Sequence, residues 1–133
     1  MGLFDFFKPK VKPFVSESAY SSNKVTQTRL TPQTMGQLRK LNVNGEHELK
    51  LEFFFYTNTQ DKAQALTTDL NKLGYEASNS LSVTNSKEYV ITGWTTKILM
   101  TDSSVGEWVN QMCDLGFKHD CEFDGWGTTP EQE

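Results

Sequence analysis

The sequence has few of the residues from which disulfide, metal and membrane structures are built. Its 133 residues include two cysteines and two histidines, too few for a disulfide framework and typical of a reducing compartment. No apolar stretch approaches the roughly 20 residues that a membrane-spanning helix needs. The hydrophobic fraction of 36% and the charged fraction of 23% also argue against a disordered chain. We therefore expect one globular, cytoplasmic domain with its own core.

The motifs of common catalytic and cofactor sites are also missing. The sequence contains no nucleophile elbow, no glycine-rich phosphate loop and no closely spaced pair of cysteines or histidines. The only candidates for a zinc site are Cys113, His119 and Cys121. Free cysteines are, however, more often buried in a core than bound to a metal. We therefore predict that the protein is not an enzyme and that it uses no metal and no cofactor.

Charge is divided unevenly along the chain. Residues 1–50 carry eight Lys and Arg against four acids, whereas residues 51–133 carry five lysines against thirteen acids. An acidic body repels phosphate backbones, so direct binding of nucleic acid is disfavoured. The same charge would steer a basic protein partner toward the body.

Residues 1–28 predict a flexible basic leader. Pro9 and Pro13 forbid a continuous helix through its basic part, and the Ser- and Thr-rich stretch that follows shows no sustained period. The apolar opening from Leu3 to Phe7 has two interpretations. It packs on the protein's own body, which we favour, or it contacts a membrane or a partner.

A short helix is predicted within residues 29–46. Thr31 offers a hydroxyl suited to a helix N-cap, and Pro32 follows at the first helical position. Apolar side chains then recur at three-residue spacing. The segment from Asn42 to Gly45 ends the predicted helix.

Six more elements follow with clear periodicity. Alternation with period two predicts the strands, and apolar stripes predict the helices. Gly74 ends the first of these helices, and Ser104 with Glu107 forms a capping box at the start of the second. The elements are a strand over 47–57, a helix over 59–73, strands over 76–83 and 87–99, a helix from Ser104 to Leu115-Gly116-Phe117, and a strand over 118–124.

This order predicts an α+β fold of the ferredoxin-like β-α-β-β-α-β type, a four-stranded antiparallel sheet with two helices on one face. The other face would then display Phe54, Tyr56 and the acids of the last strand. Asp120, Glu122 and Asp124 could form an acid–base or cation site, but we interpret them as a row that faces solvent. The fold also occurs in RNA-recognition domains, whose basic residues are absent from this sheet.

The segment Phe123-Asp124-Gly125-Trp126-Gly127-Thr128 stands out at the end of the last strand. Asp-Gly is a turn dipeptide, so Trp126 lies between two flexible points. Trp126 either folds back and closes the open edge of the sheet or anchors a partner, because tryptophan is a frequent interface hot spot.

This ending resembles the aromatic-Asp-Gly-Trp-Gly-Thr ending of the regulator of ribonuclease E activity B family. The resemblance covers about residues 47–129 and includes the aromatic strand at 52–57 and the sequence Lys72-Leu73-Gly74-Tyr75-Glu76. It implies a ferredoxin-like sandwich and a non-enzymatic inhibitor that binds the endoribonuclease E of the RNA degradosome. This chain differs from the type member in its net basic, differently organised segment 1–46.

We therefore expect a domain that binds an endoribonuclease and masks its basic RNA-binding surface. Acidic residues would steer the partner and one aromatic anchor would become buried. The candidate residues are the acids Glu52, Asp120, Glu122 and Asp124 and the aromatics Phe54, Tyr56 and Trp126. Two alternatives stay open, an immunity-type inhibitor of another nuclease or toxin and a small-molecule-sensing domain. The protein would be a monomer or a weak dimer.

Overall fold

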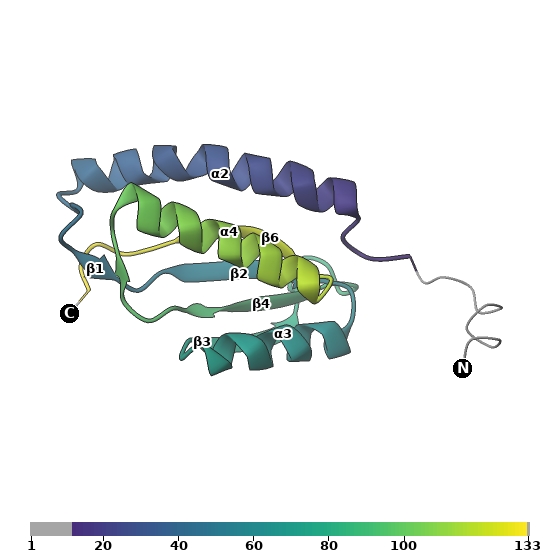
Figure 1. The fold of residues 1–133 in the computed structure, drawn as a ribbon. Coiled ribbons are helices and arrows are strands. Elements are labelled where there is room, and N and C mark those ends of the chain that lie inside the picture. Colours follow the sequence, from purple (N-terminus) through teal and green to yellow (C-terminus); the bar gives the residue numbers. More distant parts are fainter. Residues whose placement is uncertain (1–11, 133) are drawn as a thin grey trace, which may run out of the picture.

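The computed structural model describes residues 12–132 as an α+β fold (Figure 1). In this range it contains three helices and two antiparallel sheets, which confirms the predicted α+β class. The elements in chain order are α2 (Glu17–Lys40), β1 (Glu48–Leu49), β2 (Glu52–Thr57), α3 (Gln60–Lys72), β3 (Glu76–Leu81), β4 (Tyr89–Trp94), β5 (Ile98–Leu99), α4 (Asp102–Lys118) and β6 (Glu122–Gly127).

The larger sheet has the strand order β3-β4-β2-β6, and every neighbouring pair is antiparallel. In the central strand β2, Phe55 lies opposite Ile91 of β4 and opposite Phe123 of β6. A β-bulge at Asp124 shifts the register between β2 and β6, because one residue of β6 has no counterpart. This bulge separates the first half of β6 from the glycine-rich second half.

A second, two-stranded sheet of β1 and β5 was not predicted. The strands predicted over 47–57 and 87–99 are each interrupted, and their outer ends pair with each other instead of extending the larger sheet. Thr95 causes the interruption: its hydroxyl accepts a hydrogen bond from the Leu51 N–H at 2.9 Å, while its own N–H donates to the Leu51 carbonyl at 2.9 Å. The Thr95 hydroxyl thus accepts the hydrogen bond that a backbone carbonyl would accept in a continuous ladder.

The core lies between the larger sheet and the helices. Phe53 and Phe55 of β2 are fully buried there, against Leu66 and Leu70 of α3 and the apolar face of α4. The Phe55 ring centroid lies 5.2 Å from that of Phe123. Side chains of β2, α3 and α4 therefore share one hydrophobic core.

Helix α2 is much longer than predicted, because it begins at Glu17 and not at Thr31. The prediction of a flexible leader is wrong for residues 17–28, which are helical; the Leu3 to Phe7 segment lies outside the described residues. The Ser16 hydroxyl caps the helix by accepting a hydrogen bond from the Ala19 N–H, and Pro32 lies inside it. α2 runs along α4 (Figure 1).

Polar side chains hold the first half of α2 in place. The Tyr20 ring stacks on Phe117 with centroids 4.2 Å apart, Lys24 forms an ion pair with Asp114 at 2.8 Å, and the Asn23 amide donates to the Phe123 carbonyl at 2.7 Å. The buried stripe of this helix includes polar residues. Its helical period therefore does not appear as a pattern of hydrophobic residues in the sequence.

Helix α4 begins and ends differently from the prediction. The side chain of Thr101, not Ser104, caps its first turn by accepting from the Ser104 N–H. The helix ends at Lys118, beyond the predicted Leu115-Gly116-Phe117, and the left-handed conformation that follows it (φ 57°) is taken by Asp120. Gly116 is needed for another reason: a Cβ there would lie 2.8 Å from the Cys121 carbonyl oxygen and 3.0 Å from the Phe55 ring.

We expect Gly116→Ala to lower the free energy of unfolding by about 1–3 kcal/mol, because the added methyl group meets backbone that cannot move aside. Gly106→Ala in the same helix is the matched control. A Cβ at Gly106 meets nothing within 4 Å, so the gain in helix propensity should stabilise the protein by up to about 1 kcal/mol. Urea denaturation measures both, and equal effects of the two substitutions would contradict the packing argument.

Candidate functional site

The face of the larger sheet opposite the core forms a continuous surface of aromatic, acidic, hydroxyl-bearing and aliphatic side chains. Along β2, Phe53, Phe55 and Thr57 are buried, so the alternate residues point the other way. Their cross-strand neighbours on β4 and β6 join the same surface. This open sheet face consists of Glu52, Phe54 and Tyr56 of β2, Glu76, Ser78 and Ser80 of β3, Val90, Thr92 and Trp94 of β4, and Glu122 of β6.

Three carboxylates meet at one end of the open sheet face, which we call the acidic end. They are Glu122, opposite Tyr56, the bulge residue Asp124, and Glu88, which precedes β4. Partial burial raises the pKa of Glu122, and repulsion from Asp124 and Glu88 raises it further. Burial and the charge of Glu88 raise the pKa of Asp124 as well. Within residues 12–132 none of the three forms an ion pair.

Trp94 lies at the other end of the face and was not among the predicted site residues. It stands directly opposite Glu52 on β2 and Glu76 on β3, while Lys50 and Lys97 line a hollow on its other side. Charge is therefore nearly balanced at this end. The period-two alternation of β4 could have predicted that Trp94 lies on this face, because it places every second residue of β4 beside Phe54 and Tyr56.

Asp120 does not belong to the open sheet face, and the prediction that it shares a row with Glu122 and Asp124 is wrong. It precedes β6, where its carboxylate accepts hydrogen bonds from the backbone N–H groups of Phe14 at 2.8 Å and Val15 at 2.7 Å. Lys62 forms an ion pair with it at 2.6 Å. Burial opposes ionisation, but Lys62 and the two amides outweigh it and lower the pKa of Asp120. Asp120 thus fastens the segment before α2.

Trp126 lies on the packed side of β6. It is opposite Phe53, which faces the core, and its ring centroid lies 6.1 Å from that of Trp108 in a perpendicular arrangement. Gly125 before it has a φ of +123°, a conformation that only glycine adopts readily. Of the two interpretations of the sequence, this placement favours the structural one.

The groups considered for zinc binding do not form a metal site. Cys113 and Cys121 are buried, as predicted, and burial raises the pKa of each thiol to about 11, so neither is a ready nucleophile at neutral pH. The His119 Nε2 atom lies 2.6 Å from Asp69 Oδ2, and that contact lowers the pKa of Asp69. Across residues 12–132 no group of three or more metal-ligating side chains converges.

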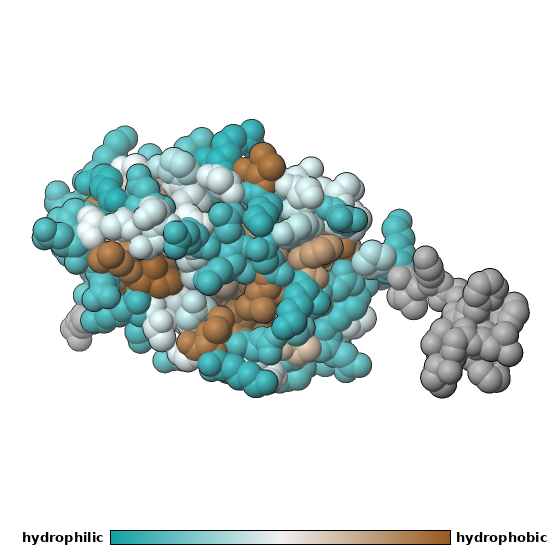
Figure 2. All heavy atoms as spheres, in the orientation of Figure 1, coloured by the Kyte–Doolittle hydropathy of each residue, from teal (hydrophilic) through white to brown (hydrophobic). Residues whose placement is uncertain are grey.

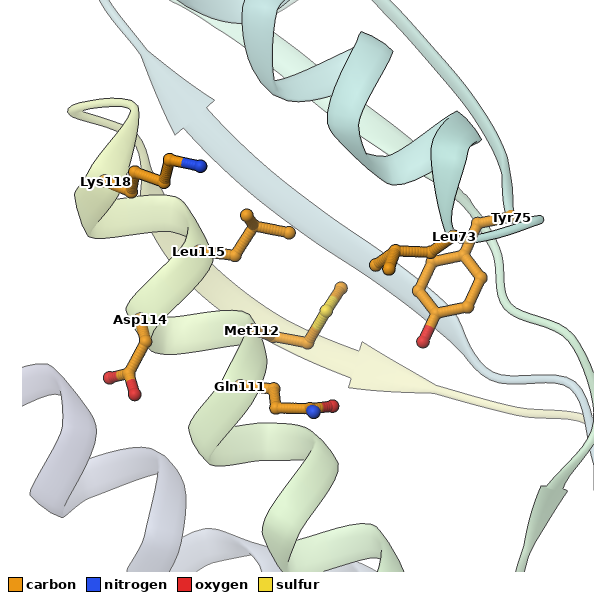
Figure 3. A pocket seen from close by; sticks show the side chains of 7 residues that line it. All are labelled: Leu73, Tyr75, Gln111, Met112, Asp114, Leu115 and Lys118. Carbon is orange, nitrogen blue, oxygen red and sulfur yellow. The ribbon is translucent and has the colours of Figure 1, made fainter.

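A groove separates α3 from α4 on the helical side of the sheet. Figure 2 shows apolar surface along this groove, and Figure 3 shows the side chains that line it. Its cavity volume is about 390 Å³. The lining residues are Leu73, Tyr75, Gln111, Met112, Asp114, Leu115 and Lys118.

Comparison with known protein families identifies the family of this chain. The model of a family described as Regulator of ribonuclease activity B matches residues 29–128. The chain belongs to this family. A search among curated proteins finds no match. The match to the Regulator of ribonuclease activity B family includes the whole larger sheet and begins inside α2, so the segment before α2 that Asp120 fastens lies outside it.

Residues 12–132 contain no helix that is both long and apolar enough to cross a membrane.

We expect Asp120→Asn to lower the free energy of unfolding by about 2 kcal/mol at neutral pH, because hydrogen bonds to a charged group contribute about 1.5–3 kcal/mol. Asparagine tolerates the left-handed backbone, so the substitution removes the charge and one of the two acceptor oxygens without straining the turn. Since the pKa of Asp120 is lowered on folding, its stabilisation is present above the usual value of 3.8 and is lost as the pH falls through the lowered value.

Urea denaturation of both proteins from pH 7 to pH 3 checks this expectation. Asp102→Asn is the control, because Asp102 forms an exposed ion pair with Arg39 at 3.3 Å and such pairs contribute less than about 1 kcal/mol. A stability difference between wild type and Asp120→Asn that persists unchanged at the lowest pH would contradict the assignment to the carboxylate.

Proposed function

We propose that this protein is a non-enzymatic inhibitor that binds an endoribonuclease of the ribonuclease E type through the open sheet face. It would lower cleavage by covering a basic RNA-binding or scaffold region of the nuclease. Membership of the Regulator of ribonuclease activity B family supports a role in regulating a ribonuclease. The observation that carries the proposal is the aromatic surface that ends in three carboxylates without ion pairs among the described residues.

Charge supports a basic protein partner. Glu88, Glu122 and Asp124 repel one another, and a lysine or arginine from a partner would relieve that repulsion while gaining charge-assisted hydrogen bonds. The same charge opposes phosphate, so RNA itself is a poor ligand for this face. Inhibition would therefore act by occupying the surface where the nuclease holds RNA.

The aromatic row supplies the apolar contact that charge alone lacks. Phe54, Tyr56 and Trp94 are all half-buried on the open sheet face, so part of each ring is available to a partner. Aromatic side chains at the centre of an interface, with charged groups at its rim, are a common source of binding energy. Of the predicted binding residues, this geometry retains Glu52, Phe54, Tyr56, Glu122 and Asp124.

We further propose that residues 47–129 form a ferredoxin-like regulator domain. The strand order β3-β4-β2-β6, with α3 and α4 on one face, supports this assignment. The β1–β5 sheet and α2 would be additions to that unit. We infer that the domain functions in the cytoplasm as a monomer or weak dimer.

Affinity capture from the native lysate tests the partner. We expect wild-type protein to retain an endoribonuclease that is released at higher salt, and the double substitution Glu122→Lys and Asp124→Lys to lose it. Glu17→Lys with Glu131→Lys is the control, since it makes the same change in net charge at two exposed positions outside the face. Mass spectrometry identifies the retained proteins, and equal recovery by all three baits would rule out docking at the acidic end.

The acidic end should also weaken the free protein. Because folding raises the pKa values of Glu122 and Asp124 above 4.5 and 3.8, their contribution to stability is present at low pH and is lost as the pH rises through the raised values. The neutral double variant Glu122→Gln, Asp124→Asn should therefore be a few tenths of a kcal/mol more stable at pH 7. Its affinity for the captured nuclease should fall. Thermal unfolding and titration of the nuclease measure the two effects, and a variant that binds undiminished would remove the proposed role.

A further inference from the structure

The α3–α4 groove lies on the helical side of the sheet and has no part in the proposed docking of a ribonuclease. Leu73, Met112 and Leu115 form its apolar lining (Figure 3). Leu73 is 55% exposed, so the groove is open to small molecules. A volume of about 390 Å³ is within the range of small-molecule sites, which are mostly apolar with a few polar groups that fix orientation.

A buried donor lies behind this groove. The Trp108 side chain is only 3% exposed, and its indole N–H has no acceptor at bonding distance and angle. Burial raises the pKa of Tyr75, and the Trp108 N–H, which lies near the Tyr75 oxygen, partly offsets that rise. An indole nitrogen can only donate, so Trp108 cannot accept from the Tyr75 O–H, which stays free to donate.

The Tyr75 hydroxyl and the Gln111 amide lie at the same end of the groove, beside Met112, and Leu115 lies farther along (Figure 3). Neither polar group has a hydrogen-bond partner at bonding distance among the described residues. At the other end, the Lys118 ammonium is 68% exposed, and its nearest acid, Asp69 at 3.6 Å, already contacts His119. Asp114 also lines the groove, and its carboxylate accepts from Lys24 and Tyr20.

We propose that the α3–α4 groove binds a small acyl compound, a hydrocarbon body that ends in a C=O group. The C=O oxygen accepts hydrogen bonds from the Tyr75 hydroxyl and the Gln111 amide, and the hydrocarbon lies along Leu73, Met112 and Leu115. This site is independent of the open sheet face and of the proposed function. The protein would then bind a small molecule in addition to its protein partner.

The test uses the full chain, isotope-labelled, with hexanoate, hexanamide and hexylammonium as probes. We expect hexanoate or hexanamide to shift the indole N–H resonance of Trp108 saturably, and hexylammonium, which has no acceptor, to leave it unchanged. Binding of hexanoate alone would identify a carboxylic acid as the natural class, and binding of hexanamide a neutral amide or ketone. No saturable shift with either probe, or an equal shift with hexylammonium, would overturn the proposal.

Two substitutions locate the site. Tyr75→Phe keeps the ring and removes the hydroxyl, so it should weaken binding roughly five- to tenfold, whereas Tyr89→Phe, outside the groove, should leave binding unchanged. Leu73→Glu places a carboxylate at an exposed position of the apolar lining and should abolish binding without unfolding the protein. Unchanged affinity in both Tyr75→Phe and Leu73→Glu would place the probes elsewhere and reject the groove.

Discussion

The alternation of side chains along β2 is the constraint on which the rest of the structure depends. Phe53 and Phe55 are fully buried under the helices, and Phe54 and Tyr56 share the opposite face with the acidic end. A register slip of one residue would exchange the two sets and place both core phenylalanines in solvent. Burial of two aromatic side chains thus fixes the register of a central strand, and the open sheet face inherits its composition from that register.

The parts of the fold that follow from apolar periodicity could be predicted from the sequence. Strand β2 and helix α3 with its stop at Gly74 both show a period that burial of apolar groups explains. The first half of α2 does not, because Asn23, Lys24 and Gln27 attach it through polar contacts. No hydrophobic pattern reveals such an interface, and the N-cap at Ser16 alone is too common a signal to place a helix.

The candidate site shows the same division between pattern and tertiary contact. Glu52, Phe54, Tyr56 and Glu122 lie where alternation puts them. Asp120 lies elsewhere because it takes a left-handed turn before β6 begins, and a turn breaks the alternation on which the prediction depended. The bulge at Asp124 then shifts the following residues by one, so Trp126 faces Trp108 in the core. The turn at Asp120 and the bulge at Asp124 leave only weak signals in the sequence. The two glycines around Trp126 are a stronger signal, but in this structure they serve packing.

Asp120 and the acidic end use similar groups for opposite purposes, and this contrast supports a binding role for the latter. The Asp120 carboxylate is paired within the fold, so its charge stabilises the protein. Glu122, which is half-buried, and Asp124, which is exposed, lie near Glu88 without a paired cation among the described residues, so their charges oppose folding. Groups that cost stability in the free protein concentrate where function needs them. A basic partner would supply the missing charge, and only in that complex would the acidic end be as well satisfied as Asp120 already is.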